Sequence, residues 1–174
     1  MRSGLRIRGK WSLVVALVGL LGLVACNGSD CPLGNTVRMH GVFYKSGADS
    51  TTSISDTLSV IALPLDTVLV SKTIDVSTLS LPLSNGEETD VLLFTWTTAA
   101  GEVVDTMVVS KTNQAHFENL DCSASYFHSL RSVTFSERTP TSAFPTVVDS
   151  VVIVNEEVNY DTGENIRLYI TTLL

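Results

Sequence analysis

The chain has 174 residues, 44% of them hydrophobic and 17% charged, with a formal net charge of −7 at pH 7. After residue 10 the basic residues form no cluster, which argues against binding to nucleic acid and against attraction to anionic lipid headgroups. The length suits one domain that buries its own hydrophobic core.

The first 25 residues predict a secretory signal peptide that is removed. Four basic residues precede the apolar run Trp11–Val24, which is shorter than the roughly 20 residues of a membrane-spanning helix. The sequence Leu23-Val24-Ala25-Cys26 closes this run and resembles the lipobox of bacterial lipoproteins, in which the sulfur and the freed amine of the cysteine are acylated. We therefore expect lipid on Cys26. An ordinary signal peptide followed by an incidental cysteine is the alternative.

The expected mature chain is a short lipidated tether at residues 26–35 followed by one domain at residues 36–174. Without the signal peptide, 7 basic and 18 acidic residues remain, which gives a net charge of −11. The acidic residues are scattered, as on a solvated, soluble surface. Attraction of a cationic partner is the less favoured interpretation.

Two further cysteines, Cys31 and Cys122, predict one disulfide, because disulfides persist beyond the inner membrane. A metal site with two cysteine ligands alone would be incomplete. A reactive free thiol is the other, less favoured alternative.

The sequence after residue 35 predicts an all-β domain. Val, Ile and Thr dominate in short runs that are broken by Gly, Pro, Asn and Asp, and no helical apolar stripe is present. We predict these strands: Thr36–Tyr44, Thr57–Leu63, Thr67–Lys72, Leu79–Leu83, Thr89–Thr97, Val103–Lys111, Ala115–Asn119, Ser125–Phe135, Val147–Asn155 and Asn165–Thr171.

Turns and loops are predicted between these strands. The three turns are Ser84–Glu87, whose Asn-Gly pair tolerates positive φ, Ala99–Glu102 and Asp161–Glu164. The segments Lys45–Ser55 and Arg138–Pro145 are predicted to be exposed loops.

Periodicity predicts which side chains are buried. The run Val91–Phe94 is apolar at consecutive positions, so we expect both faces of that strand to be covered. In the last strand, alternation predicts that Ile166, Leu168 and Ile170 are buried and that Arg167 and Tyr169 are exposed.

Many short strands favour an antiparallel β-sandwich of two packed sheets, immunoglobulin-like in outline. An immunoglobulin domain proper is disfavoured for two reasons. Trp96 lies 65 residues after Cys31, and Leu120 stands where a tyrosine corner needs Tyr.

The mature chain resembles a family of small Bacteroidota lipoproteins of unassigned function. The resemblance implies an envelope lipoprotein with a β-sandwich-like domain, and it supplies no catalytic residue. It is carried by these segments: Cys31-Pro32, His116-Phe117, Asp121-Cys122, Tyr126-Phe127-His128, Asp149–Asn155, Val158-Asn159-Tyr160 and Asn165–Ile170.

We expect no metal and no cofactor. Of the histidines His40, His116 and His128, the last two flank Cys122 by six residues on either side and would meet if the chain bends there. Zinc needs three or four compactly spaced ligands, which the sequence does not supply, so a structural or surface role is favoured. The segment Asn159–Asn165 faintly resembles a calcium loop, but it lacks the terminal bidentate Glu and is predicted to be a turn.

The chain is not predicted to be an enzyme. It has no Gly-x-Ser-x-Gly motif, and the adjacent carboxylates Glu87-Glu88 and Glu156-Glu157 sit in or beside turns, where they are solvated. We expect a non-catalytic binding or structural role through protein–protein contact in the cell envelope. One alternative is a glycan- or ligand-binding module that uses exposed Tyr160 and Tyr169. An envelope hydrolase is the less favoured alternative.

The residues after Cys26 predict the location. The lipoprotein resemblance implies outer-membrane sorting, because Asn27 replaces the Asp that retains lipoproteins at the inner membrane. The segment Asn27–Asp30 has only one acid, which favours a periplasm-facing protein over one exported to the cell surface. If Cys31 bonds to Cys122, the segment around Cys122 faces the membrane and the far ends of the sandwich become the exposed binding surface.

Overall fold

The computed structural model describes residues 36–119 and 122–173, which confirm the predicted all-β class. The predicted signal peptide, the tether, Cys26 and Cys31 lie outside these residues. No helix in the described part of the chain is long and apolar enough to cross a membrane. The strands are β1 (Met39–Lys45), β2 (Thr57–Leu63), β3 (Thr67–Thr73), β4 (Thr78–Leu81), β5 (Thr89–Thr98), β6 (Gly101–His116), β7 (Ser125–Phe135), β8 (Thr146–Ile153), β9 (Glu157–Val158) and β10 (Ile166–Thr172).

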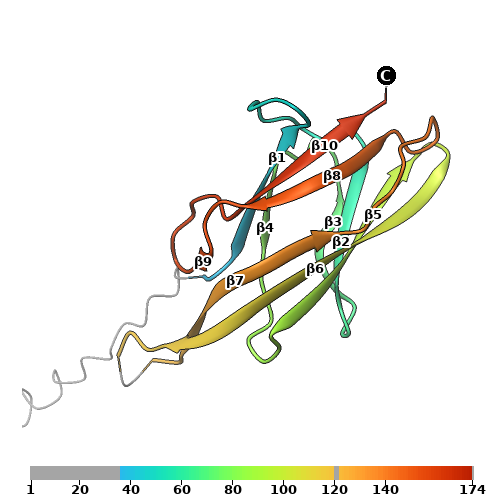
Figure 1. The fold of residues 1–174 in the computed structure, drawn as a ribbon. Coiled ribbons are helices and arrows are strands. Elements are labelled where there is room, and N and C mark those ends of the chain that lie inside the picture. Colours follow the sequence, from blue (N-terminus) through green and yellow to red (C-terminus); the bar gives the residue numbers. More distant parts are fainter. Residues whose placement is uncertain (1–35, 120–121, 174) are drawn as a thin grey trace, which may run out of the picture.

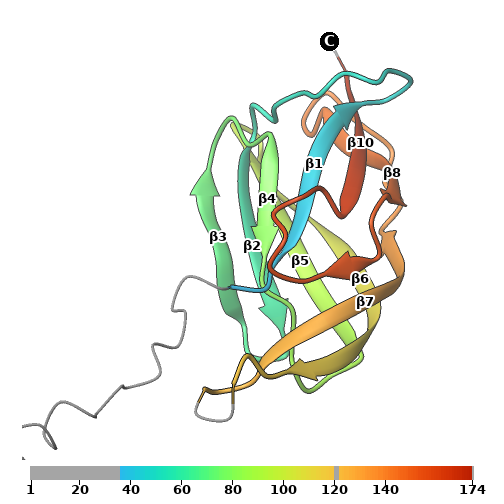
Figure 2. The ribbon, with the colours of Figure 1, turned by 90° about the vertical axis from the view of Figure 1, so that its left-hand side faces the viewer.

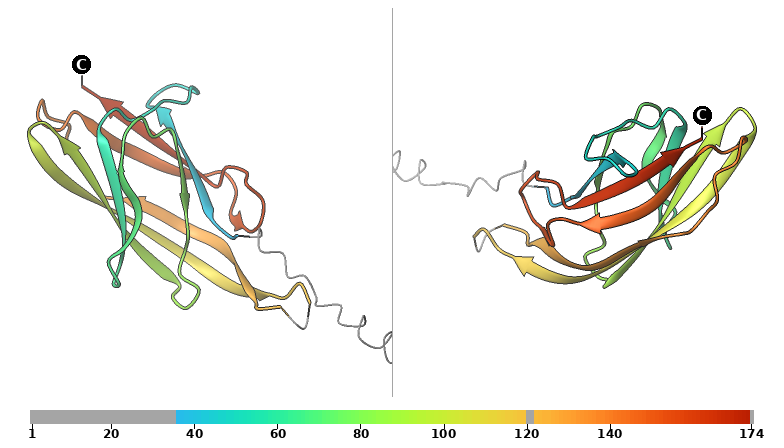
Figure 3. Two further views of the ribbon diagram at one scale, coloured as in Figure 1. Left: turned by 180° about the vertical axis from the view of Figure 1, so that it is seen from behind. Right: turned by 45° about the horizontal axis from the view of Figure 1, so that its top comes forward.

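The strands form two packed sheets, as predicted for a sandwich. One has four strands in the order β4-β1-β10-β8, and the other has six in the order β3-β2-β5-β6-β7-β9. Figure 1 and the right-hand view of Figure 3 show the larger sheet curling along the smaller one. The pairings between these strands are antiparallel except that of β1 with β10, which is parallel.

The parallel pair joins the first and the last strand of the domain. Gly41 of β1 lies opposite Ile166 of β10. A Cβ atom at Gly41 would approach Leu168 Cδ1 to 3.0 Å and Ile166 Cγ1 to 3.1 Å, so the missing side chain leaves room for these two core residues. Glycine therefore permits close packing here.

The core lies between the two sheets and follows the alternation of each strand. In β10 the predicted burial of Ile166, Leu168 and Ile170 is confirmed, while Arg167 and Tyr169 are half-buried. In β5 the inward residues are Leu92, Phe94 and Trp96. The rest of the core is Met39, Phe43, Ile54, Leu58, Val60, Val76, Leu79, Leu81, Leu83, Met107, Val109, Leu130, Val148 and Val158.

The prediction that both faces of Val91–Phe94 are covered is wrong. Leu92 and Phe94 face the core, but Val91 and Leu93 are half-buried on the outer face of the six-stranded sheet. The described residues form two layers, and no third layer lies on that face (Figure 2). Neighbouring strands shield these side chains in part, so an apolar run does not require a covering element.

The two separate strands predicted at Val103–Lys111 and Ala115–Asn119 are one strand, β6. The polar residues between them continue the ladder, because Thr112 pairs with Ser129, Asn113 with His128 and Gln114 with Phe127. These pairings to β7 maintain the strand where local composition indicates an interruption. The sequence also did not predict β9.

The predicted turns differ in outcome. The turn at Ala99–Glu102 is confirmed, since Thr98 pairs with Gly101 and Gly101 has φ of 135°. The segment around Asn85-Gly86 instead joins β4 to β5, which belong to different sheets, and neither residue has positive φ. The chain bends there as predicted, and Glu87 N donates to Ser84 Oγ at 3.1 Å, but the segment is a crossing loop between the sheets.

Candidate functional site

A fully buried lysine lies at one end of the sandwich. The Lys111 side chain has 0% exposure, and its Nζ donates to Ser84 O at 2.6 Å, to Glu87 O at 2.6 Å and to Asn113 Oδ1 at 2.8 Å. An ammonium group has three N–H donors, so these acceptors use all of them. The lysine thereby fixes the β4–β5 crossing loop to the sheet.

The charge of Lys111 is balanced by buried Asp90. Lys111 Nζ lies 3.2 Å from Asp90 Oδ2, while Asp90 Oδ1 accepts a hydrogen bond from the Ser84 backbone N–H at 3.0 Å. Oδ2 accepts no hydrogen bond within the described residues. The contact is therefore an ion pair whose attraction is electrostatic, because the lysine protons are directed elsewhere.

His128 belongs to the same cluster. The Asn113 amide donates to Asn85 O and Glu87 O, so its Oδ1 faces both Lys111 and His128 Nδ1, the latter at 2.8 Å. Oδ1 only accepts hydrogen bonds, so this network assigns the Nδ1–H tautomer to His128. Burial and then the nearby Lys111 charge lower the pKa of His128 to about 4. His128 is therefore a neutral hydrogen-bond donor at neutral pH.

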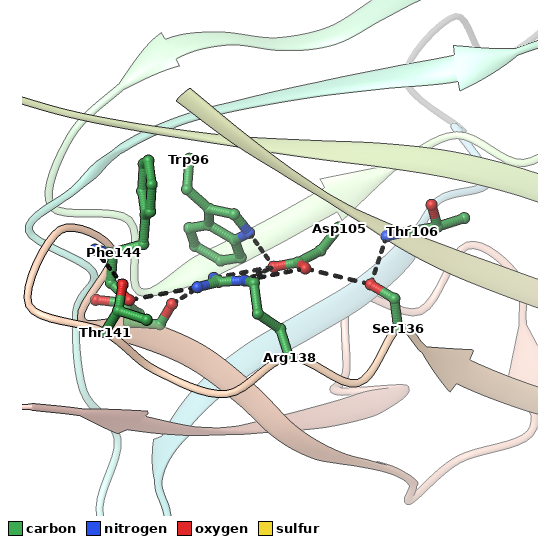
Figure 4. Close-up of polar contacts among 8 residues, drawn as sticks. Trp96, Asp105, Thr106, Ser136, Arg138, Thr141 and Phe144 are labelled. Atoms are coloured by element: carbon green, nitrogen blue, oxygen red, sulfur yellow. Dashed lines mark hydrogen bonds and ion pairs between the residues drawn. The ribbon is translucent and has the colours of Figure 1, made fainter. Parts of the chain in front are cut away.

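A second buried carboxylate lies at the opposite end of β6. Asp105 Oδ2 accepts a hydrogen bond from Trp96 Nε1 at 2.7 Å, and Oδ1 accepts one from Ser136 Oγ at 3.3 Å (Figure 4). Arg138 forms the ion pair, with Nε at 3.2 Å from both carboxylate oxygens and Nη2 at 3.1 Å from Oδ2. This is the forked geometry that makes arginine–carboxylate pairs strong.

Arg138 also fixes the loop from which it comes. Its Nη2 donates to Thr146 O at 2.6 Å, and its Nη1 donates to Phe144 O at 3.3 Å. The Arg138–Pro145 segment was predicted to be an exposed loop, and its first residue is instead directed inward. Both charged clusters thus use their donors on internal acceptors, which is a structural role.

The histidines His116 and His128 do not meet. His116 pairs with Ser125 and His128 pairs with Asn113, three positions apart on the β6–β7 ladder. An odd separation places them on opposite faces. His116 instead stacks on Phe127 with ring centroids 4.3 Å apart, and Tyr160 lies edge-on to Phe127 at 5.0 Å.

An aromatic and charged group lies on the outer face of the four-stranded sheet. Tyr44 and Tyr169 are cross-strand partners with ring centroids 5.8 Å apart. Arg167 lies 4.8 Å from the Tyr44 ring centroid and pairs with Glu164 at 3.3 Å. Hydrogen bonds to Tyr169 and then to Glu164 raise the pKa of Arg167. This group presents polar atoms beside aromatic rings, as a ligand-binding surface does.

Two hollows flank the β4–β5 crossing loop. An apolar groove of about 460 Å³ lies between this loop and the β2–β3 turn, with Leu63, Leu65 and Leu83 among its walls. A more polar hollow of about 300 Å³ is lined by Thr36, Val37, Ser125 and Tyr126, among others. The first described residue thus lies beside the start of β7.

Cys122 lies in the β6–β7 connection, whereas Cys26 and Cys31 lie outside the described residues, so lipidation and the disulfide stay predictions. No group of three or more His, Cys, Asp or Glu in the described residues could hold a metal. The predicted turn at Asp161–Glu164 is confirmed, since Asp161 Oδ1 accepts a hydrogen bond from Gly163 N at 3.1 Å.

Sequence reasoning missed the buried charges. Asp105, Met107, Val109 and Lys111 alternate along β6, so the apolar residues between the two charges indicate that both point inward. That pattern is readable from the sequence. Arg138 comes from an irregular loop, where no periodicity indicates the direction of a side chain.

Comparisons with known proteins show the family of the chain. No curated protein and no solved structure is similar to the chain. Residues 57–170, which run from β2 to near the end of β10, match a family of unknown function, DUF6452. The match spans both charged clusters and the His116–Phe127–Tyr160 ring group, but it does not include Tyr44. The chain belongs to this family.

Proposed function

We propose that the protein is a lipid-anchored component of the bacterial cell envelope with a non-catalytic binding or structural role, acting through contact with another protein. The lipobox-like sequence at Cys26 and the resemblance to Bacteroidota lipoproteins support the anchor. The internal use of Lys111 and Arg138 donors supports a non-catalytic role, since these cations act on the framework.

The observation that carries the proposal is an uncharged patch on the outer face of the six-stranded sheet, formed by β2, β5 and β6. Its cross-strand rows are Ser59-Thr95-Val104, Ile61-Leu93-Thr106 and Leu63-Val91-Val108. Val104 is 53% exposed and Leu63 is 36% exposed. A patch without charge, in a chain with 18 acidic residues, suits a partner surface that is also uncharged and partly apolar. Such patches mark protein–protein contacts.

Crosslinking and mass spectrometry in the native envelope test this role. We expect reproducible partners for the wild-type protein, and their loss in Val104→Asp. Val152→Asp is the matched control, because Val152 is 45% exposed on the outer face of the other sheet. Equal losses in the two variants, or no reproducible partner, contradict the proposal.

A glycan-binding module is the second candidate, and the paired rings of Tyr44 and Tyr169 favour it. Tyrosine rings beside Arg167 and Glu164 offer a stacking surface together with hydrogen-bonding groups. Titration with soluble peptidoglycan fragments, followed by NMR, tests this candidate. We expect saturable shifts near Tyr169 that disappear in Tyr169→Ala. Unchanged spectra at high ligand concentration contradict it.

We propose the outer membrane as the location, with the domain facing the periplasm. The support is Asn27 after the lipidated cysteine and the single acid in Asn27–Asp30. Protease treatment of intact cells should leave the protein uncut until the outer membrane is permeabilised. Full digestion of the protein on intact cells indicates surface exposure instead.

We also propose the disulfide between Cys31 and Cys122. Thr36 lies beside Ser125, and the five residues from Cys31 to Thr36 span at most about 18 Å, so the bond is within reach. The unreduced mature protein should show no titratable thiol, and Cys122→Ser should lower stability by about 2–4 kcal/mol. Two free thiols in the unreduced protein contradict the bond.

A further inference from the structure

The β6–β7 hairpin extends beyond the rest of the sandwich. On one side, β5 ends its pairing with β6 at Thr89 opposite Ser110. On the other side, β9 pairs only with His128 and Ser129 of β7. The strand ends at residues 114–116 and 125–127 therefore have no strand neighbour other than each other in the described chain. A two-stranded ribbon of this kind is marginally stable alone.

Aromatic side chains cover the end of this ribbon. His116, Phe127 and Tyr160 contact one another on one face, and Phe117, which follows β6, is 63% exposed. We call these four residues the aromatic tip. Ring contacts stabilise the ribbon, but they do not explain why a large apolar residue, Phe117, faces water at its end.

The aromatic tip lies at the end of the domain where the described chain begins. Thr36 and Val37 line the same hollow as Ser125 and Tyr126 of β7. Figures 1 and 2 show the start of β1 and the end of the β6–β7 hairpin toward the same end of the molecule, away from the C-terminus. Thr36 lies ten positions after Cys26, and this stretch spans at most about 36 Å. A lipid on Cys26 therefore keeps this end of the domain near the membrane.

We propose that the aromatic tip inserts into the headgroup region of the membrane to which the chain is anchored. This inference rests on the proposed lipid anchor and adds a second, direct contact that orients the domain. The Tyr160 ring is amphipathic and favours the boundary between headgroups and acyl chains, because its hydroxyl stays hydrated while the ring body leaves water. Phe117 adds apolar surface that is removed from water on insertion.

The negative charge near the aromatic tip favours a lipid surface without net negative charge. Glu118 and Asp161 are exposed and directly follow Phe117 and Tyr160 in the chain, and residues 112–119 and 122–129 contain no Lys or Arg. The one cation that lines the adjoining hollow among the described residues is Arg38, which donates to Ser80 O, so acidic groups outnumber it here. Anionic headgroups repel such a surface. The occupant is therefore a zwitterionic lipid surface, and the insertion is driven by apolar contact.

Depth-dependent fluorescence quenching tests the proposal on the full lipidated protein in phosphatidylcholine vesicles that contain spin-labelled lipid. Phe117→Trp places an indole at the tip. Ile74→Trp is the matched control, because Ile74 is 59% exposed and follows Thr73, which pairs with Leu58 near the opposite end of β5. Native Trp96 is 1% exposed and supplies the background signal.

We expect the lipid quencher to reduce the emission of Phe117→Trp several-fold more than that of Ile74→Trp. Adding phosphatidylglycerol to the vesicles should weaken this quenching. Equal quenching of both variants, while the protein still floats with the vesicles, overturns the aromatic tip and leaves the anchor intact. Shielding of the Phe117→Trp indole in native envelopes but not in vesicles indicates a protein partner and also overturns it. Absence of acyl mass on the N-terminal cysteine contradicts the anchor itself.

Discussion

The two buried carboxylates of β6 and β5 meet their cations in different ways. Asp105 is bonded directly by the guanidinium fork of Arg138 and also by Trp96 and Ser136. Asp90 lies 3.2 Å from an ammonium group whose three donors are directed to other acceptors. Arg138 donates hydrogen bonds to its carboxylate, whereas Lys111 donates its hydrogen bonds to the loop carbonyls and to Asn113.

Because of this difference, the two ion pairs hold different segments of the chain in place. Arg138 comes from the β7–β8 loop and reaches into a site built by β5 and β6, so the ion pair closes one end of the sandwich. Lys111 comes from the sheet and reaches out to the carbonyls of the β4–β5 crossing loop. Asp90 compensates the charge of Lys111. Removal of Lys111 should therefore leave the loop carbonyls without their donor and the buried carboxylate without its cation.

The largest expected effect on stability is that of Lys111→Met, which removes the cation of the Lys111–Asp90 pair. The variant leaves Asp90 as an uncompensated buried charge and leaves the carbonyls of Ser84 and Glu87 without a donor. We expect the free energy of unfolding to fall by about 3–5 kcal/mol in urea titrations. The double variant Asp90→Asn/Lys111→Met should recover part of this loss. A single-variant loss within about 0.5 kcal/mol would mean that the pair is not buried in solution.

The next effect is the pH dependence of stability. It distinguishes the Lys111 cluster from the Asp105 cluster, because only the Lys111 cluster contains a histidine. The folded-state pKa of His128 is about 4, below the ordinary value of 6.5. The unfolded chain therefore binds a proton first as pH falls, and stability decreases between about pH 6.5 and pH 4. The full loss is about 3 kcal/mol.

Urea titrations across this pH range should show a shallower decline for His128→Gln than for the wild-type protein. His116→Gln is the control, since His116 is half-buried in a separate ring cluster. This variant shows the effect of replacing a histidine outside the Lys111 cluster. Identical declines in all three proteins would contradict the neutral, buried state of His128.

The third effect is that of Arg138→Lys at the other end. The charge stays, but an ammonium group cannot reproduce the fork on Asp105 together with the contacts to Thr146 O and Phe144 O. We expect a loss of about 2 kcal/mol, because Trp96 and Ser136 still donate to the carboxylate. Hydrogen exchange should increase mainly in the β7–β8 loop. Uniform exchange across the domain would contradict a role confined to that loop.

The strands were predictable because their signal is local. Alternation and turn residues predicted the bounds of β2 and β7 as observed, and they predicted the buried face of β10. The continuity of β6 through Asn113 was not predictable locally. It depends on pairing with His128 of β7 and on the lysine that Asn113 contacts.

The arrangement of the strands and the charged clusters required long-range information. The parallel pairing of β1 with β10 joins residues 125 positions apart, such as Gly41 and Ile166, and no local pattern specifies it. Lys111 and Asp105 share the inward face of an alternating strand, so their burial was readable in hindsight. The burial of Asp90 was readable in the same way, since it alternates with Leu92 and Phe94 on β5, but its pairing with Lys111 was not. Arg138 comes from an irregular loop, where no alternation indicates its direction.

The smallest expected effect on stability is that of Trp96→Phe. In double variants it also tests whether the Asp105 and Lys111 clusters are energetically independent. The variant keeps an aromatic ring beside Phe94 but removes the indole N–H that donates to Asp105 Oδ2. We expect a loss of about 1–2 kcal/mol, measured by circular dichroism in urea because the buried fluorophore is gone.

Trp96 and Arg138 share Oδ2, so Trp96→Phe and Arg138→Lys should be non-additive by at least about 0.5 kcal/mol. Asp105 and Lys111 are six residues apart on β6, about 20 Å, so Trp96→Phe and Lys111→Met should be additive within about 0.5 kcal/mol. Coupling of the same size in both double variants would mean that the two ends of the sandwich respond as one unit.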